Sequence, residues 1–240
     1  MYLYVRILEK DDYYAGSDGA WFAGVKLKLE KASGERCLVV PSGEFNMDVL
    51  RELKPRAVAI SGFSKSFQFH EMSAFLGIDE FWHNSNIPTI CFCGGHQLLA
   101  FSWNQDLKGA ERLYDEGMRK LEPFEDGLFY NFDGVLWYNT AGIYQVRKIK
   151  DDPLFDGLPE NMLLPCYHYC EIKKLPEGFE VIASSGHCEI EAIKHKSRPL
   201  YGTQFHPESY REDYQDGRII LENFAKITDK FWQGKGWSEI

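Results

Sequence analysis

Two spacings of apolar residues alternate along the chain. Short runs rich in β-branched and aromatic residues, typical of buried strands, occur at residues 3–8, 36–40, 57–61, 87–92, 142–150, 181–184, 191–195 and 200–204. Between several of these runs, apolar residues recur every three or four positions, which predicts helices at residues 20–31, 46–53, 70–84, 94–103 and 216–228. We expect Asp18 to cap the first helix, after a loop at residues 11–19. The alternation predicts a single three-layer α/β domain, with a mostly parallel central sheet and helices on both faces.

Cys93 lies where the apolar run at residues 87–92 gives way to a predicted helix, with Gly94 and Gly95 directly after it. A strand–turn–helix with a nucleophile at the turn presents that side chain at the top of a sheet. The free N–H groups and the dipole of the helix N-terminus favour a thiolate there. An ordinary buried cysteine at a strand end is the alternative that this stretch alone leaves open.

A second candidate stretch lies near the C-terminus, where a short apolar strand ends before His206 and Glu208 follows two residues later. A cysteine nucleophile needs a base, and the base needs an acceptor that orients it. Pro207 restricts the backbone between the two side chains. We therefore expect the fold to bring Cys93, His206 and Glu208 together as a catalytic triad.

These two stretches resemble the signatures of the class I glutamine amidotransferases, the triad-type glutaminase domains. That family carries Gly-x-Cys-x-Gly-x-Gln around its nucleophile and Gln-Phe-His-Pro-Glu further on. The chain has, in the same order, Cys91-Phe92-Cys93-Gly94-Gly95-His96-Gln97 and Gln204-Phe205-His206-Pro207-Glu208. The resemblance implies the family's flavodoxin-like fold with a nucleophile elbow. It also implies an enzyme that hydrolyses the glutamine side-chain amide through a Cys93 thioester, releasing glutamate and ammonia without a cofactor.

The resemblance assigns further site residues. The family's Ser-Gly-Gly-Pro-x-Ser loop corresponds to residues 61–66, so backbone N–H groups of Gly62, Phe63 and Gly94 are expected to form the oxyanion hole. Phe63 stands where the family has its second glycine. Because phenylalanine does not easily adopt a positive φ, the loop must bend differently here. By the same resemblance, Gln97 and His168 are expected to hold the substrate.

The other cysteines allow two further interpretations. Cys91 replaces a family glycine two residues before Cys93, and a redox pair of the two is disfavoured because strand neighbours two apart are poorly placed to bridge. A zinc site would draw on Cys166, His168, Cys170, His187 and Cys188. Alternation puts the first three of these on one strand face, where small cysteines suit a core, so no metal site is predicted.

We expect one domain over residues 1–240. The segment at residues 105–140, between the nucleophile helix and the next strand, is longer than the family usually has at this place. Within this insertion the pattern predicts a helix at residues 111–120, an acidic turn at 122–126 and an aromatic-rich strand at 128–138. An insertion near a catalytic loop is a candidate lid or docking surface. A surface hairpin without a role in function is the open alternative.

Charge and composition exclude several classes of function. The formal net charge of −9 argues against nucleic-acid binding, which needs a basic patch. No apolar stretch is long enough to span a membrane, and the first residues lack a signal-peptide layout. The six cysteines lack a small-domain disulfide spacing, which favours reduced thiols. We therefore expect a cytoplasmic protein that binds neither nucleic acid nor membrane.

The sequence does not identify the molecule that accepts the ammonia. The chain has no Walker-type phosphate loop and no room for a synthetase domain, so a separate synthetase subunit is the expected partner. A stand-alone peptidase or hydrolase acting on another γ-glutamyl compound stays open. So does a catalytically silent binding or regulatory module, which only the substitutions Cys91 and Phe63 support.

Overall fold

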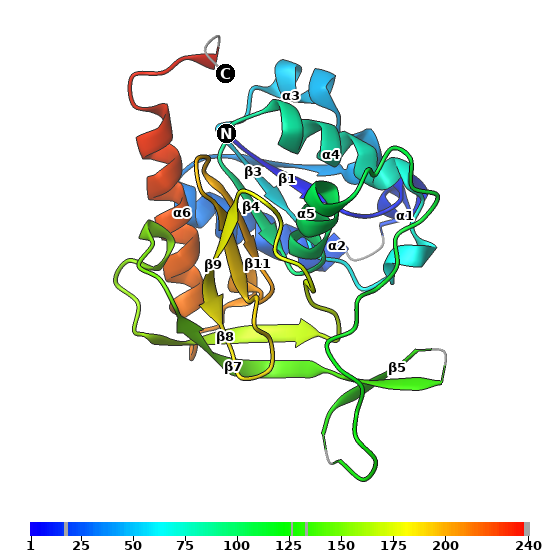
Figure 1. Ribbon diagram of the computed structural model, residues 1–240. Coiled ribbons are helices and arrows are strands. Elements are labelled where there is room, and N and C mark those ends of the chain that lie inside the picture. Colours follow the sequence, from blue (N-terminus) through cyan, green and yellow to red (C-terminus); the bar gives the residue numbers. More distant parts are fainter. Residues whose placement is uncertain (17–18, 126, 133, 238–240) are drawn as a thin grey trace.

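The computed structural model describes residues 1–16, 19–125, 127–132 and 134–237 (Figure 1). Its main sheet has the strand order β2-β1-β3-β4-β11-β10-β9-β7-β8. The strands from β2 to β11 in this order are parallel: β2 (Cys37–Pro41), β1 (Tyr2–Arg6), β3 (Ala57–Ile60), β4 (Thr89–Phe92) and β11 (Leu200–Thr203). The rest continue the sheet antiparallel: β10 (Ala192–His195), β9 (Phe179–Ser184), β7 (Thr140–Lys148) and β8 (Asn161–His168).

Helices cover both faces of the sheet because its strands are apolar on both sides. On one face, Tyr2 and Tyr4 pack with α2 (Gly19–Ser33) and α6 (Asp216–Trp232). On the other face, Leu3 and Val5 pack with α3 (Met47–Leu53), α4 (Ser73–Asn84) and α5 (Gly94–Asn104). Figure 1 shows the helices on both sides of the strands. The predicted three-layer α/β domain is therefore confirmed.

The remaining elements are short. A two-stranded hairpin consists of β5 (Phe129–Phe132) and β6 (Val135–Tyr138). Single turns of 3-10 helix occur at η1 (Ser42–Glu44), η2 (Phe67–Phe69), η3 (Pro153–Phe155) and η4 (Pro207–Ser209). A short helix, α1 (Lys10–Tyr14), lies in the stretch predicted as a loop. The predicted capping residue, Asp18, lies outside the described residues. None of the helices in the described ranges is long and apolar enough to cross a bilayer.

The helix predicted at residues 111–120 is wrong. The chain forms no helix over these residues, and single β-bridges join Gly117 to Cys170 and Lys120 to Trp137. Leu113 is buried in the core, so tertiary packing overrides the local helical preference. Gly117 adds to this, since glycine is unfavourable in a helix interior. The single strand predicted at residues 128–138 is also wrong, because β5 and β6 fold back on each other.

The parallel strands β3, β4 and β11 lie side by side and end at the same edge of the sheet. Cys93 follows β4 directly, residues 61–63 follow β3, and residues 204–208 follow β11. Ligands of α/β sheets bind at this carboxyl edge. The topology therefore gathers the three motifs of the sequence at one place.

Candidate active site

Cys93 forms a sharp elbow between β4 and α5. Its backbone has φ 46° and ψ −107°, a region that non-glycine residues rarely adopt. The elbow is held from both sides, because the Cys93 N–H donates to the Thr203 carbonyl at 2.7 Å and the Cys93 carbonyl accepts from the Gln97 N–H at 3.0 Å. Strain of this kind costs about 1–3 kcal/mol and concentrates at functional sites.

His206 and Glu208 form a buried pair. The Nδ1 atom of His206 lies 2.7 Å from Oε1 of Glu208, whose side chain is 2% exposed. Burial by itself lowers the pKa of His206, but the Glu208 carboxylate and the Cys93 sulfur outweigh it and raise that pKa well above its ordinary value. The geometry therefore favours an imidazolium beside Cys93.

Gly62 lies between the cysteine and the histidine. A Cβ at this position would lie 3.1 Å from Cβ of Cys93 and 3.4 Å from Cε1 of His206. Residues from three separate strand ends thus converge within contact distance, as the sequence predicts for Cys93 and His206.

We expect Gly62→Ala to lower the catalytic rate by about 10- to 100-fold, because displacing reacting groups by a fraction of an ångström weakens their alignment. Steady-state kinetics with glutamine, the substrate that the sequence resemblance implies, measures this effect. Gly43→Ala is the matched control, since a Cβ at Gly43 meets nothing within 4 Å. An unchanged rate in Gly62→Ala would contradict the close approach of Cys93 and His206 to this backbone.

Arg6, at the end of β1, fixes the loop after β3. Its Nη1 donates to the Gly62 carbonyl at 2.6 Å and to Oγ of Ser61 at 3.1 Å. In a trans peptide the N–H points away from the carbonyl of the same unit. The bond to Arg6 therefore sets the direction of the Phe63 N–H, one of the predicted oxyanion donors.

Phe63, which stands where the family has a glycine, does not adopt a positive φ. Among the described residues other than glycine, positive φ occurs at Lys54, Cys93 and Phe124, so Phe63 keeps an ordinary conformation. The Phe63 ring packs directly on Gly94, the residue after Cys93. A Cβ at Gly94 would lie 2.5 Å from a carbon of that ring. The loop thus bends without the positive φ that a glycine allows, in agreement with the expectation from sequence.

Two cavities adjoin at Cys93, and Phe63, Ser64 and Tyr167 line both of them. The smaller, 280 Å³, is also lined by Gln97 and His168. The larger, 670 Å³, is also lined by Gly62, His206 and Glu208, and by the basic residues Arg6, Lys28 and Arg211.

A glutamine-rich network connects the smaller cavity to the nucleophile. Nε2 of Gln97 donates to Oε1 of Gln204 at 3.0 Å and to the Cys170 carbonyl at 3.0 Å. Nε2 of Gln204 lies 3.5 Å from Sγ of Cys93. A ring nitrogen of His168, Nδ1, lies 3.0 Å from the same Cys170 carbonyl. Both predicted substrate-binding residues therefore lie beside Cys93, with these polar atoms bonded to the protein.

The family profile "Glutamine amidotransferase class-I" matches residues 31–227. The chain belongs to this family. Among its relatives, a glutamine-hydrolyzing GMP synthase subunit of Methanocaldococcus jannaschii is 33% identical over 147 residues, covering 60% of this chain and 62% of that protein. The corresponding subunit of Pyrococcus furiosus is 28% identical over 181 residues, covering 75% and 80%. The chain thus spans a little under two thirds of the first relative's length.

Two solved structures share the fold of this amidotransferase domain. A Thermoplasma acidophilum protein described as a GMP synthase subunit superposes with a TM-score of 0.71 at 22% identity, covering 97% of this chain and 96% of that one. The glutaminase domain of Trypanosoma brucei CTPS with bound acivicin gives 0.66 at 16% identity, covering 96% and 94%. At these identities the similarity concerns the fold.

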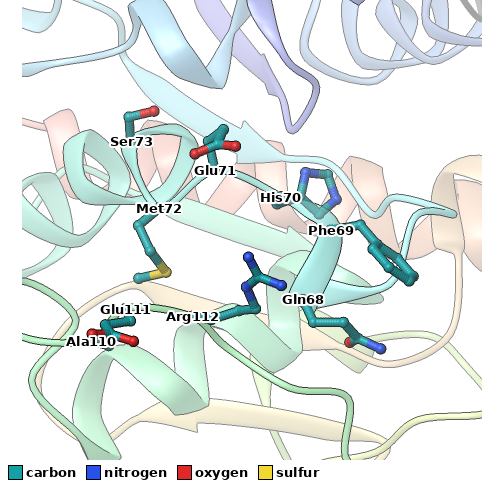
Figure 2. Close-up of a pocket in the computed structure, with 9 residues that line it drawn as sticks. All are labelled: Gln68, Phe69, His70, Glu71, Met72, Ser73, Ala110, Glu111 and Arg112. Carbon is teal, nitrogen blue, oxygen red and sulfur yellow. The ribbon is translucent and has the colours of Figure 1, made fainter.

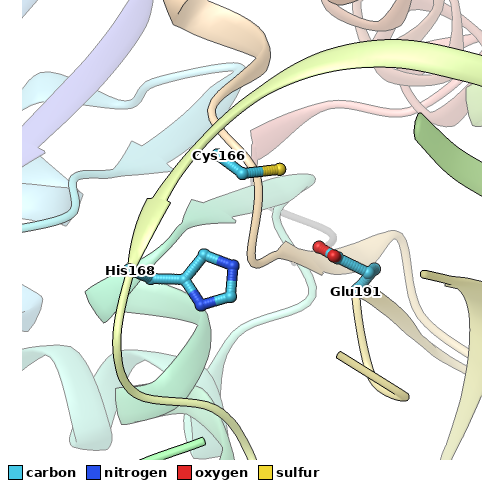
Figure 3. A group of neighbouring side chains, drawn as sticks. All are labelled: Cys166, His168 and Glu191. Carbon is cyan, nitrogen blue, oxygen red and sulfur yellow. The ribbon is translucent and has the colours of Figure 1, made fainter. Parts of the chain in front are cut away.

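Cys166, His168 and Glu191 form a buried group (Figure 3), and His168 also lines the smaller cavity at Cys93. Their potential ligand atoms all lie within 4.8 Å of one another. Such a set could hold a divalent ion such as zinc. Burial raises the pKa of Glu191 to about 7 and lowers that of His168 to about 4, so burial favours the neutral form of both side chains.

The residues that the sequence offers for a zinc site differ from the residues that the structure brings together. Of the five residues considered for zinc, only Cys166 and His168 belong to this group, and no second group of this kind occurs in the described part of the chain. Glu191 was missed because Glu189 and Glu191 flank Ile190, and nothing in that stretch marks one of the two carboxylates as buried. Cys91, the other departure from the family, is buried in the core, which raises the pKa of its thiol well above the ordinary value.

A third cavity, of 410 Å³, lies at the start of α4 (Figure 2). It is formed by residues 68–73 and 110–112, including Glu71, Glu111 and Arg112. Within the described residues it shares no lining side chain with the two cavities at Cys93. It is therefore separate from the candidate active site.

Proposed function

We propose that this chain hydrolyses the side-chain amide of glutamine, with Cys93 as nucleophile, His206 as acid and base, and Glu208 as the group that orients His206. The observation that carries the proposal is the strained elbow of Cys93 at a helix N-terminus beside the His206–Glu208 pair. These are the parts of a nucleophile–base–orienter set. Their intact geometry argues against a catalytically silent module.

In the proposed reaction the Cys93 thiolate attacks the carboxamide carbon and forms a carbon–sulfur bond. The N–H groups of Phe63 and Gly94, with the Gly62 turn, stabilise the oxyanion that develops. The carbon–nitrogen bond then breaks as the His206 imidazolium gives its proton to the departing ammonia. Water, deprotonated by His206, attacks the γ-glutamyl thioester. The carbon–sulfur bond then breaks, glutamate leaves, and the Cys93 thiolate and the protonated His206 are restored.

A separate synthetase subunit is the proposed recipient of the ammonia. The supporting observation is that relatives at 33% and 28% identity are named as one subunit of a glutamine-hydrolyzing GMP synthase. A protein named as one subunit implies at least one other. Gel filtration of this chain with a candidate synthetase subunit, followed by acceptor amination with glutamine as nitrogen source, tests the partnership.

The test of the hydrolytic function is release of glutamate and ammonia from glutamine by the purified chain, with a γ-glutamyl dipeptide in parallel. Turnover that prefers glutamine supports the proposal. Preference for the dipeptide would replace it by the second candidate below. If neither is turned over, labelling of Cys93 by a glutamine-analogue electrophile distinguishes a competent site from an inert one, and lack of labelling would contradict the proposal.

A stand-alone γ-glutamyl peptidase is the second candidate, and one observation favours it. The cavity that His206 lines has a volume of 670 Å³, far more than ammonia needs as a leaving group. A peptide or amine leaving group would fill such a space.

A further inference from the structure

Three buried side chains from two segments of the chain are directed toward one space (Figure 3). Cys166 and His168 share one face of β8, and Glu191 lies directly before β10. Each side chain belongs to a residue that is at most 4% exposed, and their potential ligand atoms lie within 4.8 Å of one another. The proposed hydrolysis uses neither Cys166 nor Glu191, so the mechanism leaves this buried group without a role.

Two polar atoms of the group are unpartnered. In the described part of the chain, Nε2 of His168 and Oε2 of Glu191 are buried and have no hydrogen-bond partner. Most buried polar atoms in proteins are hydrogen-bonded, and an exception often marks a bound water, an ion or a catalytic group. These two atoms therefore point to a ligand that the group can hold.

The His168 ring has the orientation of a metal ligand. Its Nδ1 lies 3.0 Å from the Cys170 carbonyl. Because a carbonyl only accepts hydrogen bonds, Nδ1 carries the proton, and in the neutral ring Nε2 keeps its lone pair. Burial lowers the pKa of His168 to about 4, which keeps the ring neutral at neutral pH. A backbone carbonyl bonded to the other ring nitrogen is a usual support for a histidine that binds a metal.

The ligand types and their spacing suit zinc. Thiolate sulfur, imidazole nitrogen and carboxylate oxygen are common zinc ligands, whereas Mg²⁺ and Ca²⁺ prefer oxygen. Bond lengths of about 2.0–2.3 Å place two ligand atoms of a tetrahedral zinc ion roughly 3.3–3.8 Å apart. Side-chain shifts of about an ångström would therefore close the three ligands around one ion.

A divalent ion also balances the charge of the group. Zinc binds the deprotonated forms of cysteine and glutamate, so the protons of both side chains leave for the solvent as the ion enters. The thiolate of Cys166 and the carboxylate of Glu191 then compensate the charge of the ion, which avoids the cost of an unpaired charge in the interior. His168 also lines the smaller cavity at Cys93, which gives the ion a path from the solvent.

We propose that Cys166, His168 and Glu191 bind one zinc ion that ties β8 to the start of β10. These strands are not neighbours, since β9 and β7 lie between them in the sheet. The sequence pattern predicts no metal site, because only the fold brings Glu191 to the two residues of β8. The inference does not depend on the hydrolytic function.

The two segments that the ion joins both support the segment that carries His206. On β8, the Pro165 carbonyl accepts from the His206 N–H at 2.8 Å. Before β10, the Glu191 carbonyl accepts from the Gln204 N–H at 2.7 Å. A zinc ion between these segments therefore stabilises the backbone on both sides of residues 204–206.

Metal binding is measured on the chain without an affinity tag, in a Cys93→Ala background, so that the nucleophile supplies no thiolate. One sample is purified in zinc-containing buffer, dialysed and analysed for metal. A second sample, freed of metal with a chelator under reducing conditions, is titrated with zinc chloride and with cobalt chloride. We expect about one zinc ion per chain and a cobalt spectrum with the charge-transfer band of a thiolate ligand. Zinc should also raise the urea midpoint of the metal-free chain, because it binds the folded state.

Two substitutions in this background test the ligands. Cys166→Ser should abolish the thiolate band of cobalt. Glu191→Gln should lower the zinc affinity by about 100-fold or more, since loss of a residue that merely supports a ligand already costs about 10- to 100-fold. Cys37→Ser, the matched control, changes a buried cysteine outside the group and should keep both the band and the affinity.

A chain that retains no zinc and gives no cobalt band would overturn the proposal, and would favour a hydrogen bond from a protonated Glu191 to His168. A thiolate band that survives Cys166→Ser, or a zinc affinity unchanged by Glu191→Gln, would place the ion elsewhere and overturn the proposal as well. If Cys166→Ser does not fold, the zinc affinity of Glu191→Gln decides alone.

Discussion

Replacing Cys93 with alanine is expected to lower glutamine hydrolysis by at least about a thousandfold, because the thioester needs a thiolate at the elbow. Cys170 also lines the smaller cavity, but burial raises the pKa of its thiol and disfavours its thiolate. The fold should remain intact. Cys93 contributes a small side chain that is 6% exposed, and alanine fills nearly the same volume without adding a new contact. The change in unfolding free energy should stay within about 1.5 kcal/mol, the usual limit for substitutions that nearly conserve volume.

The measurement is ammonia release at saturating glutamine, together with urea unfolding of both proteins. Cys37→Ala is a matched control, since Cys37 is also a buried cysteine and lies on β2, which β1 and β3 separate from β4. It should lose some stability and keep its activity. Hydrolysis by Cys93→Ala at the wild-type rate would remove Cys93 from the mechanism.

Local motifs and strand patterns explain why Cys93, His206 and Glu208 lie close together in the structure. Strand patterns predicted the buried runs that became β3, β4 and β11, and parallel strands must end at one edge, so Cys93 and His206 had to meet. Pro207 restricts the backbone between His206 and Glu208, whose side chains lie 2.7 Å apart. Here a short-range pattern and the sheet topology together determine the geometry.

The residues that sequence did not identify act through contacts between distant segments. Arg6 lies 56 positions before the carbonyl it holds at Gly62, and Glu191 meets Cys166 and His168 from another segment of the chain. Neither has a local periodicity or motif that marks it. The predicted helix at residues 111–120 failed for the same reason, since the pairing of Gly117 with Cys170 outweighs local propensity.

The second large effect is expected for Glu208→Gln. The carboxylate raises the pKa of His206 against the effect of burial, which lowers it. Glutamine keeps the shape but removes the charge, so the pKa of His206 should fall, and less imidazolium is available at neutral pH to protonate ammonia. We expect kcat/KM at pH 7 to fall about 10²- to 10⁴-fold, in the range found for loss of the orienting acid in comparable triads.

The pH profile separates this cause from a general loss of structure. In wild type the alkaline limb of activity follows deprotonation of His206 at its raised pKa, so in Glu208→Gln that limb should move to lower pH. The stability effect has a defined sign as well. A raised histidine pKa stabilises the fold fully below the ordinary pKa of about 6.5, and this contribution is lost as the pH rises through the folded-state value. The stability difference between wild type and variant should therefore shrink as the pH rises through that range.

Activity and urea unfolding measured across the pH range, with Glu212→Gln as an exposed control, test both parts of this prediction. An alkaline limb that stays in place would show that Glu208 does not set the charge of His206. A uniform loss of rate with an unmoved limb would assign Glu208 to orientation of the ring alone. A limb that moves to lower pH identifies the buried carboxylate as the group that keeps His206 protonated, which the departing ammonia requires.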